Sequence, residues 1–378
     1  MRSIKFFQAK KTDVLIVDVV SIDFRNFYLP SGYSNFALDF RKSLPVFFSI
    51  RFLKGLLLGF WQFLFSSKRY ISLILLHGAV YHLCPRIIVT FSDNNTSLAA
   101  YSRNNPNINM VAIQNACRSI HSFKRRTELP IFCALGDTEK KIFQELKIKP
   151  DAYHALGSVK LAIAWEQWRD QDKNTRDISF ISHYRPKLFF DQSSISKKIE
   201  SCQRELFQLC CAFAKSRKLN LTVIAKMRGP SSEVDAERSY YETLADGFPL
   251  QFITSSMGGK ELNSYFAGFE SRLVVTPGST LGFELLSSGT KVLFGATAVV
   301  DFVNSWGTKH YFERLPPLVR LSSKLAYSDF FKSCDNLLGM PQENFRAITQ
   351  GPSNSILAFS EKNPAHKMLA KLISDNMR

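Results

Sequence analysis

The chain has 378 residues, 45% of them hydrophobic and 21% charged, so it is long enough for two domains and apolar enough for a large core. This composition excludes a disordered or fibrous protein. The 49 Lys and Arg outnumber the 32 Asp and Glu and give a net charge of +17, which favours anionic partners such as nucleic acid, phosphorylated substrates or an anionic membrane.

Short apolar runs that end in polar turn residues recur along the first half of the chain. A β-branched run over residues 14–20 predicts a buried strand. Four further strands are expected at residues 86–91, 109–114, 131–135 and 151–156. Helices are expected between them at residues 71–81, 97–102 and 138–146. This alternation predicts a parallel sheet with crossover helices.

One segment of the first half is unusually apolar. Residues 47–65 read FFSIRFLKGLLLGFWQFLF and contain two cations, Arg51 and Lys54. Two central cations make a membrane-spanning helix costly. A core helix of an α/β domain and a helix lying on an anionic membrane surface both fit the pattern, and both interpretations stay open here.

The alternation restarts after residues 166–177, which are almost wholly polar and predict an interdomain linker. Strands are expected at residues 178–182, 221–227, 250–254, 273–276 and 291–294, and helices at 194–218, 234–244, 260–266, 280–287, 328–338 and 364–374. We therefore predict an α/β fold of two Rossmann-like domains with parallel sheets facing across a cleft. The predicted domains span residues 1–165 and 178–360, and the last segment, 361–378, is a helix expected to cross back to the first domain.

Several classes of site have no signature in the sequence. The 7 Cys are scattered without CxxC spacing and indicate reduced thiols, and the N-terminus has no secretory signal, so a cytoplasmic protein is expected. The His residues are dispersed and no DxD motif occurs, so we expect no metal and no cofactor. The cations are spread along the chain without a nucleic-acid-binding motif, so nucleic acid is not an expected partner.

The segment 273–295 carries the most chemical information. A buried strand runs into Gly278, and Ser279 and Thr280 open a short helix. The free N–H groups and the dipole of a helix N-terminus bind phosphate. Glu284 lies one turn deeper on the same face, where its carboxylate can accept hydrogen bonds from sugar hydroxyls. The alternative is a structural Ser cap with a Glu on the surface.

This segment resembles the donor-binding unit of GT-B glycosyltransferases. Residues 279–289, STLGFELLSSG, are similar to the pattern S-T-L-G-[YF]-E-L/A-L-x-x-G-K of bacterial surface-carbohydrate biosynthesis proteins. Three shorter islands resemble the same group, namely residues 93–95 (DNN), 113–118 (IQNACR, with Ala116 where the group has Gly) and 157–160 (GSVK). The resemblance spans about residues 85–295 and extends distantly to retaining β-Kdo transferases.

The resemblance also implies roles for individual residues. In that group an Asp on the acceptor-side domain acts as nucleophile, which makes Asp93 the candidate catalytic residue. Asp93 also follows a strand, at the edge where ligands of such sheets bind, although an Asx turn or helix cap is the alternative. Residues expected to bind the substrate are Asn94, Asn95, Gln114, Asn115 and Arg118.

On the donor side, cations that follow strands can neutralise the departing phosphate in place of a metal. Residues expected to bind the donor are Ser182, His183, Arg185, Lys226, Arg228, Gly278, Ser279, Thr280 and Glu284.

Together these features predict a metal-independent GT-B-type glycosyltransferase. It would move a sugar from a nucleotide-activated donor onto a lipid-linked surface polysaccharide such as lipopolysaccharide O-antigen or capsule, at the inner face of the cytoplasmic membrane. The resemblance further implies a retaining reaction and a CMP-Kdo-like donor. One alternative is a sugar-nucleotide epimerase of the same fold, which needs several carboxylates and His for acid–base work. The other is a non-catalytic membrane-associated scaffold that binds polyanions with a steep salt dependence.

Overall fold

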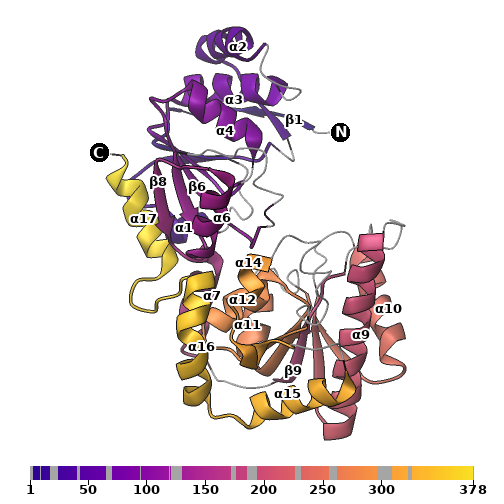
Figure 1. Ribbon diagram of the computed structural model, residues 1–378. Helices are drawn as coiled ribbons and strands as arrows, with labels where there is room; N and C mark the ends of the chain where they lie inside the picture. The colour runs from indigo at the N-terminus through magenta and orange to yellow at the C-terminus, as the bar shows by residue number, and fades with distance from the viewer. Residues whose placement is uncertain are drawn as a thin grey trace. The chain divides into compact units, whose positions relative to one another are not determined.

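The chain folds into two compact units in the computed structural model (Figure 1). Unit 1 comprises Met1–Val159 and Ser360–Arg378, and unit 2 comprises Lys160–Phe359. The structure describes residues 3–8, 10–17, 24–40, 43–64, 70–93, 95–118, 120, 130–171, 176–184, 194–225, 231–254, 262–295, 309–321 and 326–377. Each unit has its own parallel sheet, so the predicted α/β class with two Rossmann-like sheets is confirmed.

The main sheet of unit 1 has six strands in the order β3-β2-β5-β6-β7-β8, and all its pairs are parallel. The strands are β2 (Val14–Val17), β3 (Asn35–Leu38), β5 (Ile87–Thr90), β6 (Asn109–Ile113), β7 (Ile131–Ala134) and β8 (Ala152–Ala155). Strands β2, β5 and β7 are buried at every position, as expected for a sheet covered on both faces. The strand order changes direction between β2 and β5, and ligands of such sheets bind at this switch point.

Helices and a small second sheet complete unit 1. The helices are α1 (Arg25–Tyr28), α2 (Ile50–Phe63), α3 (Tyr70–Leu83), α4 (Thr96–Asn104), α6 (Thr138–Leu146) and α17 (Ala365–Asp375). The second sheet pairs β1 (Ser3–Phe7) with β4 (Ser43–Phe47). Helix α17 belongs to unit 1, where Asn109 Nδ2 donates to the Asn376 carbonyl at 2.9 Å and Arg86 donates to the Met377 carbonyl.

The α2–α3 hairpin is built on close contact between glycines. Ser49 caps α2, because its Oγ accepts the Phe52 N–H at 3.0 Å. A Cβ at Gly55 would lie 2.9 Å from the Gly78 Cα of α3 and 2.6 Å from the Tyr81 Cβ. In Figure 1, α3 lies between α2 and the rest of unit 1. No helix in the described part of the chain is long and apolar enough to cross a membrane.

This packing gives the first testable prediction. Gly55→Ala gains about 1 kcal/mol of helix propensity, but the new methyl group collides with backbone, and overpacking of this kind costs about 1–3 kcal/mol. We therefore expect a net loss of unfolding free energy in urea titrations. Gly339→Ala is the matched control, because nothing lies within 4 Å of a Cβ at that helical position. A Gly55→Ala variant as stable as that control would contradict the close helix contact.

The sheet of unit 2 has the order β11-β10-β9-β12-β13, again with parallel pairs. Its strands are β9 (Arg176–Ile181), β10 (Leu221–Ile224), β11 (Leu250–Ile253), β12 (Ser271–Thr276) and β13 (Val292–Phe294). Its helices are α7 (Val159–Trp168), α9 (Ser194–Arg217), α10 (Ser231–Ala245), α11 (Asn263–Phe269), α12 (Thr280–Ser287), α14 (Lys309–Phe312), the 3₁₀ helix η4 (Pro317–Val319), α15 (Tyr327–Gly339) and α16 (Gln342–Ile356). Numbered from β9, this is the order 3-2-1-4-5, whose switch point lies between β9 and β12.

Helix α7 differs from the sequence-based boundary. The rings of Trp165 and Trp168 pack against Phe269 of unit 2. This aromatic packing carries the helix through Trp168, so the expected domain boundary at residue 165 falls inside a helix, and the units divide after Val159 instead.

Candidate functional site

The carboxyl ends of β5 and β6 bring three of the predicted residues together in unit 1. Arg118 Nε donates to Asp93 Oδ2 at 2.9 Å, and Arg118 Nη2 donates to the other carboxylate oxygen. The same Nη2 donates to Asn115 Oδ1 at 2.8 Å. Asn115 Nδ2 in turn donates to the Phe91 carbonyl at 2.7 Å, which fixes the amide to the end of β5. The guanidinium is therefore held from two sides at the sheet edge.

The ion pair turns its cation outward rather than its carboxylate. The Asp93 side chain is 0% exposed, whereas 20% of the Arg118 side chain is exposed. Burial raises the pKa of Asp93, and the guanidinium opposes that shift. In this geometry Asp93 orients Arg118, and Arg118 is the group of the pair that can meet an anionic substrate. The nucleophilic role of Asp93 stays a prediction.

Gln114 reaches into the protein and binds a carboxylate that sequence reasoning did not select. Gln114 Nε2 donates to Glu139 Oε1 at 2.6 Å, and Gln114 Oε1 accepts the Leu135 N–H at 3.0 Å. Glu139 stands in the first turn of α6 and is fully buried. An acidic residue in the first turn of a helix that follows a strand was the only signal for it, and that signal is equally typical of a surface residue.

The other predicted residues near β5 have different outcomes. Asn95 caps α4, because its Oδ1 accepts the N–H groups of Ser97 at 2.9 Å and Leu98 at 3.3 Å. Its carbonyl oxygen therefore has a structural role. Asn94 lies outside the described residues.

In unit 2 the end of β12 forms a tight turn at the switch point of the sheet. Thr276 Oγ1 accepts the N–H groups of Gly278 at 3.2 Å and Ser279 at 3.1 Å, and Ser279 Oγ accepts the Leu281 N–H at 3.3 Å. A Cβ at Gly278 would lie 2.6 Å from the Phe312 ring, so the turn needs glycine there. Ser279 thus has the capping role that the structural interpretation gave it, and Thr280 opens α12.

Glu284 is buried, so its interpretation as a surface residue is wrong. Only 5% of the residue is exposed, and both carboxylate oxygens lie 3.0 Å from the Tyr265 hydroxyl, which donates to them. Tyr265 comes from α11, so the turn, α12 and α11 form one packed assembly behind the switch point.

Ser182, at the end of β9, has its hydrogen-bonding capacity filled from within unit 2. Its hydroxyl donates to the buried Glu237 and accepts from the Tyr241 hydroxyl at 2.9 Å and the Tyr184 N–H at 3.0 Å. One donor and two acceptors are the full capacity of a hydroxyl. Ser182 therefore shapes the end of β9 and does not bind the donor directly in this arrangement.

The remaining predicted donor residues are a histidine and three cations. His183 follows Ser182 and is buried. Arg185, Lys226 and Arg228 lie outside the described residues.

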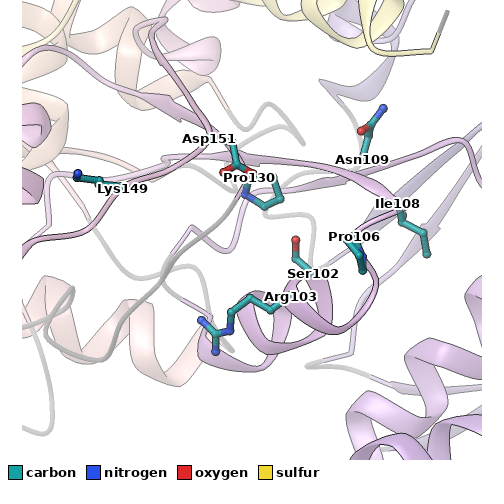
Figure 2. Close-up of a pocket in the computed structure, with 8 residues that line it drawn as sticks. All are labelled: Ser102, Arg103, Pro106, Ile108, Asn109, Pro130, Lys149 and Asp151. Atoms are coloured by element: carbon teal, nitrogen blue, oxygen red, sulfur yellow. The ribbon is translucent and has the colours of Figure 1, made fainter.

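Each unit has a pocket at the edge of its sheet that is opposite to these residues. The pocket of unit 1, about 300 Å³ in volume, includes Asn109, Pro130 and Asp151 at the starts of β6, β7 and β8 (Figure 2). The pocket of unit 2, about 460 Å³, includes Ser271 and Lys291 at the starts of β12 and β13. Neither pocket contains a predicted site residue. Within the described ranges, no group of three or more His, Cys, Asp or Glu is placed to hold a metal ion.

Comparison with known proteins finds similar structures. No protein-family model and no curated protein matches the chain. The chain is similar to the UDP-GlcNAc 2-epimerase from Neisseria meningitidis bound to UDP-GlcNAc, with 13% identity, a TM-score of 0.55 and coverage of 97% of this chain and 99% of that one. The UDP-GlcNAc 2-epimerase from Methanocaldococcus jannaschii in complex with UDP-GlcNAc and UDP has 8% identity, a TM-score of 0.57 and the same coverages.

A third similar structure is the wall teichoic acid polymerase TagF soaked with CDPG, at 11% identity and a TM-score of 0.53 over 97% of this chain and 89% of that chain. At these identities the similarity shows the fold alone. The fold is that of GT-B-like enzymes with two Rossmann-like domains, and it hosts both sugar-nucleotide epimerases and a glycosyltransferase-like polymerase. None of the three is a Kdo transferase.

Proposed function

We propose that the protein is a glycosyltransferase that uses a nucleotide-activated sugar, with the donor bound by unit 2. The observation that carries the proposal is the assembly at the β9/β12 switch point. There, a turn that requires glycine leads into α12, and α12 carries the buried carboxylate of Glu284. Switch points of 3-2-1-4-5 sheets are where this fold class binds nucleotides. The similar structures, which were solved with UDP-GlcNAc or CDPG, support the same ligand class.

Each part of this assembly has a role in the proposal. The N-terminal dipole of α12 favours the donor phosphates at the Gly278–Ser279 turn. Glu284 accepts hydrogen bonds from ribose hydroxyls, with Tyr265 holding the carboxylate in one orientation. In unit 1, Arg118 binds an anionic group of the donor or acceptor, and Asp93 and Asn115 fix its position.

The finer details rest on the motif resemblance of residues 279–289 and the shorter islands. On that basis the proposal includes a CMP-activated Kdo-like sugar as donor and a lipid-linked surface polysaccharide as acceptor.

Nucleotide binding is the first test. We expect one member of a panel of CMP, UMP, UDP, GDP and ADP to raise the melting temperature selectively and in moderate salt, because a ligand of the native state stabilises it by mass action. Glu284→Gln should abolish most of that shift. Glu242→Gln, the same change on the exposed surface of α10, should leave it intact. Equal shifts with every nucleotide and with inorganic polyphosphate would contradict the proposal and favour the polyanion-binding scaffold.

A sugar-nucleotide epimerase is the second candidate, and one observation favours it. Two buried carboxylates, Asp93 and Glu139, stand beyond the carboxyl ends of β5 and β7. Epimerisation at carbon breaks a C–H bond and needs acid–base groups, which carboxylates can supply. Incubation with UDP-GlcNAc in D₂O separates the candidates. Deuterium in the sugar without nucleotide release indicates an epimerase. A transferase instead releases the nucleotide from the sugar donor that matches the nucleotide selected in the melting panel, and the release depends on an added acceptor.

A further inference from the structure

Helix α2 presents an apolar face to solvent. Ile50, Leu53, Leu57 and Trp61 are 86%, 63%, 59% and 67% exposed. Their spacing of three and four residues places them on one side of the helix. Helices on protein surfaces normally direct polar residues outward, so an exposed apolar face of this kind is unusual. We call these four residues the apolar face.

The apolar face cannot be buried by rotating the helix. The opposite side of α2 carries Phe52, Gly55, Gly59 and Phe63, all buried. Those two glycines pack against α3 too closely for any side chain, so the orientation of α2 is fixed. One side of α2 is therefore buried, as the core-helix interpretation expected, and the other side is exposed, while contact with a membrane surface stays a prediction.

The exposed apolar surface continues beyond the helix. Phe48, just before the cap of α2, stacks on Phe6 of β1 with ring centroids 5.0 Å apart, and both are exposed. Eight of the thirteen exposed large hydrophobic residues in the described part of the chain fall between Phe48 and Ile71. This concentration, rather than any single side chain, marks an interaction surface.

The charge of the sequence segment that contains α2 selects the kind of partner. Residues 40–92 contain seven Lys and Arg and no Asp or Glu. Two of these cations, Arg51 and Lys54, are exposed on α2 itself. A second copy of the chain, seated by two-fold symmetry, would bring the same cations against one another. An anionic lipid surface instead offers hydrocarbon for the apolar face and headgroups for the cations.

We infer that unit 1 docks on an anionic lipid bilayer through the apolar face of α2, with the helix lying in the plane of the interface. Leu53, Leu57 and Trp61 enter the acyl boundary, and Arg51 and Lys54 lie at the headgroups. The inference rests on the exposed apolar residues and the cations of unit 1. It is independent of the nucleotide site proposed in unit 2.

Vesicle flotation of the full chain tests the inference. We expect the protein to float with vesicles of phosphatidylcholine and phosphatidylglycerol and to bind pure phosphatidylcholine much more weakly. The triple variant L53Q/L57Q/W61Q should lose at least about tenfold in partitioning, because three exposed apolar side chains no longer enter the lipid. The control variant Y327Q/I348Q alters hydrophobic residues of similar exposure on α15 and α16 and should partition as the wild type does.

Two further measurements sharpen the result. R51Q/K54Q should reduce the preference for phosphatidylglycerol and the sensitivity of binding to salt. Trp61 is the single tryptophan of unit 1, so brominated acyl chains should quench wild-type fluorescence far more than that of Trp61→Phe.

The inference is overturned if the triple variant floats like the wild type. It is also overturned if the wild type sediments as a dimer that the triple variant converts to monomers, with vesicle binding unchanged, because a second copy would then cover α2. The nucleotide-induced melting shift of the triple variant should equal that of the wild type. This readout keeps the lipid surface and the nucleotide site separately testable.

Discussion

Asp93→Asn is expected to destabilise unit 1 by about 3–5 kcal/mol, because removing one partner of a buried ion pair leaves the other charge uncompensated. The loss should lie toward the lower end of that range, since a fifth of the Arg118 side chain reaches solvent. Turnover of a nucleotide sugar should fall by about a hundredfold or more once Arg118 is no longer aimed. Unfolding in guanidinium chloride measures the loss of stability, and steady-state assays measure the loss of turnover.

The reciprocal substitution at Arg118 tests the coupling of the ion pair from its other side. In Arg118→Met the pKa of Asp93 should rise further, because burial remains and the opposing guanidinium is gone. A carboxyl group whose folded pKa exceeds its unfolded pKa contributes most stability at low pH and loses it as pH rises through the folded value. Arg118→Met should therefore be nearest to wild-type stability in acid and fall behind as pH increases. Strict additivity of the two substitutions in D93N/R118M would contradict a coupled pair.

Gln114→Leu is the second substitution with a large expected effect, about 3 kcal/mol or more. It removes the amide that donates to the buried Glu139 carboxylate and accepts the Leu135 N–H. A buried polar group that loses its hydrogen-bond partner lowers the free energy of unfolding by its desolvation penalty. Gln114→Glu is unsuitable as a control because it adds a second buried carboxylate.

Glu139→Gln tests the same pair from its other side. It removes the charge and keeps the shape, so it should leave stability within about 1 kcal/mol of the wild type. If activity nevertheless disappears in Glu139→Gln, the carboxylate itself takes part in the reaction, and the epimerase candidate gains. A Gln114→Leu variant as stable as the wild type would show that the hydrogen bond from the Gln114 amide to Glu139 is dispensable.

Burial explains which elements could be predicted from the sequence. The strands of both main sheets that are buried on each face read as mainly apolar runs, and β2, β5, β7 and β10 were predicted for that reason. Strand β4 contains Pro45 and alternates between buried and half-buried residues, so it has no such run. Helix α16 contains Pro352 after a glycine, the usual signal of a break, yet packing of Phe345, Thr349 and Ile356 holds it together.

The candidate site, like the fold, could be predicted only in part from the sequence. Asp93, Asn115 and Arg118 were each selected near the end of a strand, and the structure brings them into contact because the carboxyl ends of neighbouring parallel strands meet at one edge of a sheet. Spacing along the chain could not show which way each side chain turns. Gln114 and Ser182 turn inward to the buried carboxylates of Glu139 and Glu237, which are 25 and 55 residues away in the sequence.

The path of the chain through the two units has a consequence for biosynthesis. Unit 2 is one continuous stretch, Lys160–Phe359, whereas unit 1 is made from both ends of the sequence. A ribosome therefore delivers a complete unit 2 before it delivers α17, whose neighbouring residues bind Arg86 and Asn109. The inserted unit can fold while its host still lacks α17, so completion of the host unit waits for a segment that is synthesised after the inserted unit.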